Sequence, residues 1–127
     1  MSGTIKQTFQ MSVGNGGFAD AVTINNLEVV QNNIGASSGV RTIGFAADEV
    51  IDTGDLATEG YVFIKNLEET GGNFITWGPD AVIPGTMVGC GEVKPGEFAW
   101  FRLKSGIVFR AQADTADVQA DIRIYED

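Results

Sequence analysis

The chain has 127 residues and no histidine. The side chains to consider for chemistry are therefore its carboxylates and its one thiol. Histidine is the commonest general base and the commonest metal ligand, so the usual catalytic triads are excluded. Cys90 stands between Gly89 and Gly91, and with no imidazole to activate it we interpret it as a small structural residue. A single cysteine also excludes an internal disulfide and a metal site built from several thiolates.

Four acids lie close together in one glycine-containing segment: Glu49, Asp52, Asp55 and Glu59. A glycosidase needs two carboxylates that flank the scissile bond, and this segment offers candidates for such a pair. Adjacent acids in a loop of this kind are ordinarily solvated, however, and a small β-sandwich seldom carries a glycosidase cleft. We therefore predict no catalytic residues and no enzymatic activity.

Calcium binding is the second chemistry that the acids suggest, since Ca²⁺ takes hard oxygen ligands from loops. Two groups of aspartates are candidates: Asp48, Asp52 and Asp55, and Asp114, Asp117 and Asp121. Neither group has the glycine and the final glutamate where an EF-hand loop requires them. We expect no metal and no cofactor, and a carbohydrate-binding module, with or without calcium, stays an alternative function.

The charge of the chain restricts its partners. Its 17 acidic and 8 basic residues give a net charge of −9, and the basic residues are scattered singly. Phosphate groups are bound by clustered Lys and Arg, so nucleic acid and anionic membrane surfaces are disfavoured as partners. The sequence from Met1 lacks the basic and apolar regions of a signal peptide, and we expect synthesis in the cytoplasm.

Short apolar runs separated by turn signals predict the elements that carry these residues. Val, Ile, Phe and Thr together with 17 glycines favour strands joined by tight turns. We predict an all-β protein, an antiparallel β-sandwich of eight or nine strands with a jelly-roll-like arrangement, as a single domain over residues 1–127. A closed barrel is the alternative.

The N-terminal segment predicts two long strands. Apolar residues of the first alternate with polar ones and predict one buried face: Ile5, Phe9, Met11 and Val13. In the second strand, expected at residues 21–30, the apolar positions change parity near Asn25 and Asn26. A β-bulge at these two asparagines would absorb the change.

The aromatic residues of the C-terminal half are assigned from their neighbours. Residues 61–64 and, apart from Arg102, residues 98–103 are apolar at successive positions, which is typical of central strands covered on both sides. Trp100 is therefore expected in the core. Trp77 precedes Gly78 at a strand end, and we predict that Trp77, with Phe74, contacts a partner.

One turn is specified in detail by its residues. Lys94, Pro95, Gly96 and Glu97 predict a type II turn, with proline at the second position and glycine at the third, where a positive φ is required. We expect this turn to set the register of the strand that follows.

Four strand and turn motifs recur in order along the C-terminal half: residues 60–67 (GYVFIKNL), 73–78 (NFITWG), 93–97 (VKPGE) and 118–127 (VQADIRIYED). Together they resemble small virion structural proteins of tailed bacteriophages over residues 60–127, with Val93 where that group has leucine. The resemblance implies a non-enzymatic β-sandwich in the virion that decorates or cements the capsid by binding the major capsid protein. The alternative that it implies is a head-fibre or tail component bound to another virion protein. It also implies a homo-oligomer, with a trimer favoured because capsids offer threefold positions.

Overall fold

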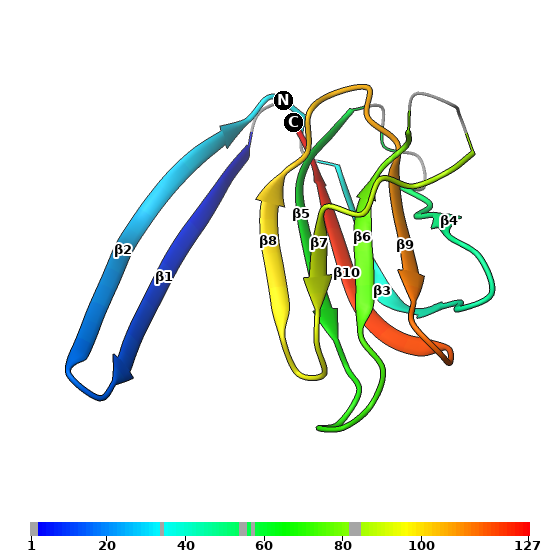
Figure 1. The fold of residues 1–127 in the computed structure, drawn as a ribbon. Helices are drawn as coiled ribbons and strands as arrows, with labels where there is room; N and C mark the ends of the chain where they lie inside the picture. The colour runs from blue at the N-terminus through cyan, green and yellow to red at the C-terminus, as the bar shows by residue number, and fades with distance from the viewer. Residues whose placement is uncertain (1–2, 34, 54–55, 57, 82–84) are drawn as a thin grey trace. The chain divides into compact units, whose positions relative to one another are not determined.

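The structure is a computed structural model that describes residues 3–33, 35–53, 56, 58–81 and 85–127 (Figure 1). These residues form ten β-strands and no helix, and all paired strands are antiparallel. The predicted all-β class is confirmed, although more strands are present than the eight or nine expected. The chain divides into two compact units, Met1–Ile34 and Gly35–Asp127. A single domain over residues 1–127 stays a prediction.

The first unit is a long two-stranded hairpin, here called the arm. Its strands are β1 (Gly3–Asn15) and β2 (Phe18–Gln31), and they pair only with each other among the described residues. The buried face predicted for the first strand is not buried, because Phe9, Met11 and Val13 are 40, 38 and 41% exposed. The alternation of apolar and polar residues shows which side chains share a face, but not what covers that face.

The β-bulge predicted in the arm is confirmed. Gln7 pairs with Leu27 and Phe9 pairs with Ile24, so two residues of β2 lie opposite the one residue between Gln7 and Phe9. One of the two, Asn26, has a φ of 50°, a left-handed value that asparagine adopts more readily than most residues.

The second unit contains two four-stranded sheets packed against each other (Figure 1). Sheet I has the strand order β3 (Ala36–Ile43), β10 (Val118–Glu126), β5 (Glu59–Asn66) and β8 (Phe98–Arg102). Sheet II has the order β4 (Glu49–Val50), β9 (Phe109–Ala113), β6 (Ile75–Pro79) and β7 (Gly91–Val93). The predicted β-sandwich is confirmed, and the finer jelly-roll-like arrangement, with which these orders are compatible, stays a prediction.

The core lies between the two sheets and is built from alternate residues of their strands. In β5 and β10 the core-facing side chains have no exposed surface: Val62, Ile64, Ile122 and Ile124. Between them the strands present half-buried or exposed residues to the outside. Sheet I therefore has a mainly aliphatic face inside and a different face outside.

The predicted turn is present and is held to the end of β5. Gly96 has a φ of 79°, and the Glu97 N–H donates to the Lys94 carbonyl at 2.9 Å, as a type II turn with Pro95 in second place requires. The Gly96 N–H donates to the Asn66 carbonyl at 3.1 Å, and the Asn66 N–H donates to the Glu97 carbonyl at 3.0 Å. The turn thus fixes the start of β8 against β5.

Asn66 is a fully buried polar residue that the sequence did not single out. Its side-chain amide donates to the carbonyls of Asn73 at 2.9 Å and Val93 at 3.0 Å. Its side-chain oxygen accepts the N–H of Glu68 at 2.9 Å. One side chain therefore joins three backbone segments at this end of the sandwich, which offsets the cost of burying it.

Candidate functional site

Asp48, one of the aspartates considered as calcium ligands, is engaged in an ion pair. Asp48 and Asp80 both bind the guanidinium of Arg110 on β9, Asp48 through its Oδ1 atom at 2.7 Å from Nη1. The side-chain hydrogen bond to Asp80 is the main cause that raises the pKa of Arg110, and Asp48 adds to it. The N–H of Met87 donates to the other oxygen of Asp48 at 3.3 Å. This cluster fastens two loops to sheet II.

Two aspartates of the second group make local contacts, whereas one carboxylate oxygen of the third, Asp114, is buried without a hydrogen bond among the described residues. Asp117 accepts the N–H of Phe45 at 3.2 Å, and Asp121 pairs with Arg123 at 3.1 Å. Asp55 lies outside the described residues. Within the described ranges, no group of three or more histidine, cysteine, aspartate or glutamate residues could hold a metal ion.

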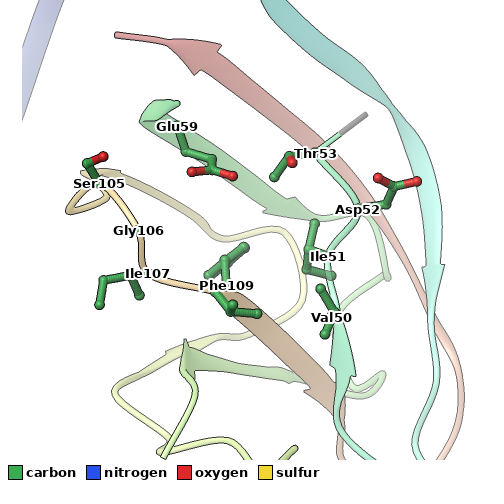
Figure 2. Close-up of a pocket in the computed structure, with 10 residues that line it drawn as sticks. Val50, Ile51, Asp52, Thr53, Glu59, Ser105, Gly106, Ile107 and Phe109 are labelled. Carbon is green, nitrogen blue, oxygen red and sulfur yellow. The ribbon is translucent and has the colours of Figure 1, made fainter. Parts of the chain in front are cut away.

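A pocket of about 460 Å³ lies beside β4 and β9, and its lining includes two of the acids considered for glycosidase chemistry, Asp52 and Glu59. Figure 2 shows their carboxylates on opposite sides of the pocket, with Asp52 directed away from Glu59. Glu49 is not in the lining, and its Oε1 atom accepts the N–H of Gly44 at 3.2 Å. A glycosidase pair must face the bond that it flanks, whereas the carboxylate of Asp52 is directed away from Glu59.

The outward face of sheet I carries a group of aromatic side chains on three adjacent strands, here called the aromatic face: Tyr61, Phe63, Phe98, Trp100 and Tyr125. The rings are in contact with one another. Tyr61 and Trp100 stack with centroids 4.8 Å apart and planes 1° from parallel, and Tyr125 meets Trp100 edge-on at 6.0 Å. Phe63 and Phe98 stack at 5.9 Å. Such ring pairs form a preorganised apolar surface.

Two arginines lie over these rings. The guanidinium carbon of Arg102 is 5.1 Å from the centroid of Tyr61, and Arg102 also pairs with Asp127 at 2.5 Å. The hydrogen bond to Asp127 is the main cause that raises the pKa of Arg102. The two contacts together restrain a long flexible side chain over the aromatic ring.

The second arginine repeats this arrangement on β10, two strands away from β8. Arg123 lies 6.0 Å from the centroid of Phe63 and pairs with Asp121. The side-chain hydrogen bond to Asp121 is the main cause that raises the pKa of Arg123. The aromatic face therefore combines rings with cations whose charges are balanced by neighbouring carboxylates.

Trp77, one of the two predicted partner contacts, is half-buried. It packs against the core and stacks on Phe101 of sheet I, with centroids 4.4 Å apart and planes 8° from parallel. Gly91 on the neighbouring strand leaves room for the indole, since a Cβ there would lie 2.3 Å from the ring. Phe74, the second predicted contact, is half-buried just before β6, and its carbonyl accepts the N–H of Asp114 at 3.2 Å. A partner contact by either residue stays a prediction.

Trp100 is not in the core as predicted, but on the outward aromatic face. Its strand, β8, is an edge strand that pairs only with β5 among the described residues, not a central strand covered on both sides. Ala99 and Phe101, on either side of Trp100 in the chain, pack against the core instead. The alternation of side chains along β8 therefore places Trp100 outside.

Comparisons with family models, curated proteins and solved structures found no match to this chain. In the described part of the chain, no helix is long and apolar enough to cross a membrane. The resemblance to phage virion proteins therefore stays an expectation from the sequence motifs, and the aromatic face has to be interpreted from its own chemistry.

Proposed function

We propose that this chain is a non-enzymatic structural protein of a tailed-phage virion, a capsid decoration or cement protein that binds the major capsid protein through the aromatic face. The observation that supports the proposal is the grouping of tyrosine, tryptophan and arginine on one outward sheet surface. These three residue types dominate the binding energy of protein interfaces. Stacked rings and restrained arginines also lose little side-chain entropy when a partner docks.

The arrangement of the rings favours a protein partner over a sugar. A sugar-binding platform presents an open ring face on which a pyranose lies. Here the face of Tyr61 is stacked on Trp100, and the guanidinium of Arg102 lies over the same phenol ring. Trp77, the ring expected to hold sugar in the carbohydrate-binding alternative, is stacked on Phe101 instead.

The charges argue against single-stranded nucleic acid, which also uses aromatic rings and arginines. Such a site needs cations free to meet phosphates, whereas Arg102 pairs with Asp127 and Arg123 with Asp121. A chain with a net charge of −9 also repels a polyanion at longer range. A protein surface with its own apolar and polar groups is the better match.

Mass spectrometry of purified virions tests the location. The protein is expected in intact particles at a copy number comparable to that of the capsid protein, and its absence from particles would end the proposal. Presence only in tails or fibres would overturn the capsid assignment and leave the virion assignment standing.

Binding to capsids that lack the protein tests the surface. Phe98 is 55% exposed at the rim of the aromatic face, and Phe98→Asp is expected to weaken binding at least about 100-fold, because it places a charge in an apolar contact. Phe45→Asp is the matched control, since Phe45 is 47% exposed and lies outside the strands of sheet I. Equal binding by the two variants would show that the aromatic face is not the contact.

A further inference from the structure

The arm has one apolar face and one mainly polar face along its whole length. Residues that pair directly across an antiparallel hairpin project to the same side. The apolar members of one side, here called the arm face, are Ile5, Phe9, Met11, Val13, Phe18, Val22, Ile24, Leu27 and Val29. The other side carries Lys6, Glu28, Gln10 and Thr23, with Lys6 and Glu28 forming an ion pair at 3.3 Å.

The β-bulge is what keeps the arm face continuous. Side chains alternate along a strand, so without an extra residue Leu27 would project to the side opposite Ile24. The bulge restores both to one side, and it places Asn26 at a positive φ that most residues avoid. A hairpin with water on both sides gains nothing from such continuity, whereas a hairpin that packs along its length requires it.

The exposed area of the arm face matches an interface between two arms. Phe9 and Ile24, at its middle, are 40 and 43% exposed, and Phe18 near the tip is 60% exposed. Summed over the nine side chains this is roughly 600 Å² per arm, or about 1,200 Å² for two arms face to face, which reaches the lower limit of specific protein interfaces. An isolated two-stranded hairpin is marginal in water, and two packed hairpins make the two-layer structure that is stable.

The distribution of charge favours another arm as the occupant of this face. The first unit carries only Lys6, Asp20 and Glu28, a net charge of −1, which leaves −8 of the chain's −9 on residues 35–127. Copies that repel one another through their sandwich units can therefore meet through their arms at little electrostatic cost. Asp20 is the one charged residue that pairs onto the side of the arm face, and it lies toward the hairpin tip.

We infer that the arm face packs against the arm face of another copy of this chain and holds the protein as an oligomer. The expected homo-oligomer thereby gains a defined contact surface. The inference does not rest on the virion proposal, because it concerns the purified protein alone, and either can fail without the other.

The molar mass of the full-length protein, measured by light scattering during size exclusion over a range of concentrations, is the test. The wild type is expected to have the mass of two copies, because two arm faces packed face to face leave none for a third. The pair Phe9→Asp and Ile24→Asp replaces cross-strand neighbours at the centre of the arm face, and is expected to raise the dissociation constant at least about 100-fold. Met11→Gln is a milder variant, with an expected rise of about 10-fold.

The adjacent cross-strand pair supplies the control. Gln10→Asp with Thr23→Asp adds the same charges one position along, on the polar side, and is expected to keep the wild-type mass. Fluorescence of Trp77 and Trp100, both in the second unit, checks that each variant keeps a folded sandwich. A wild-type monomer at all concentrations, an unchanged mass for both arm-face variants, or equal dissociation of the control would each overturn the inference.

Discussion

Replacing Asn66 by leucine is expected to destabilise the sandwich unit by about 3 to 5 kcal/mol. Leucine has the same branching but is larger, and it makes none of the three hydrogen bonds of the Asn66 side chain. The carbonyl of Val93 stays buried without that donor, at a cost of about 1 to 3 kcal/mol. Asn73 and Glu68 are partly accessible to water, so their lost bonds add about 1 kcal/mol each.

The assay is urea denaturation followed by tryptophan fluorescence, with the free energy of unfolding extrapolated to water. Gln119→Leu is the control, because Gln119 is an exposed amide on the outward side of β10 that bonds to Thr42. Its expected effect is within about 0.5 kcal/mol. A loss below about 1 kcal/mol for Asn66→Leu would refute the reasoning, since it would mean that water or relaxation satisfies the three partners.

Asn66→Asp separates hydrogen bonding from packing. A buried carboxylate that faces two carbonyls has its pKa raised above that of the unfolded chain. The folded state of the variant then binds more protons than the unfolded state, so its stability is greatest below the unfolded pKa of about 4 and falls as the pH rises through the folded pKa. The same denaturation curves at several pH values measure this slope relative to wild type, and parallel pH profiles would contradict it.

Two further changes test the placement of the tryptophans. Gly91→Ala is expected to lower the free energy of unfolding by about 2 kcal/mol, because the new Cβ would lie 2.3 Å from the ring of Trp77. Gly44→Ala is the control and should leave the stability nearly unchanged, since the nearest atom to its Cβ is 3.9 Å away. Trp100→Ala is expected to lower the free energy of unfolding by only about 1 to 2 kcal/mol, since the ring is half-buried on the aromatic face. The same change is expected to weaken binding to capsids. A loss of about 3 to 5 kcal/mol would instead place the ring in the core.

Local features of the fold could be predicted from the sequence, because each depends on neighbouring residues. The change of parity at Asn25 and Asn26 predicted a bulge, and Pro95 followed by Gly96 predicted a turn with a positive φ. Both follow from steric limits on a few dihedral angles. Features that depend on the order of strands within a sheet were not accessible in this way.

The candidate site shows where such prediction ends. Successive apolar residues in β5 and β8 were interpreted as strands covered on both sides, yet only alternate residues, Phe101 among them, face the core, and the rings of the aromatic face lie outside. The signal was the alternation itself, in which Tyr61 and Phe63 take one parity and Val62 and Ile64 the other. Asn66 carried no such signal, because its partners at Asn73 and Val93 are brought near only by the complete fold.

Because most of the negative charge lies on the second unit, the salt concentration should affect how strongly copies of the chain associate. If copies meet through an almost neutral arm while their sandwich units repel, dissolved salt weakens the repulsion and leaves the apolar contact intact. The dissociation constant is therefore expected to be higher in dilute buffer than at the ionic strength of a cell, where the screening length is about 8 Å. The acidic surface would thus make the strength of association depend on the salt concentration.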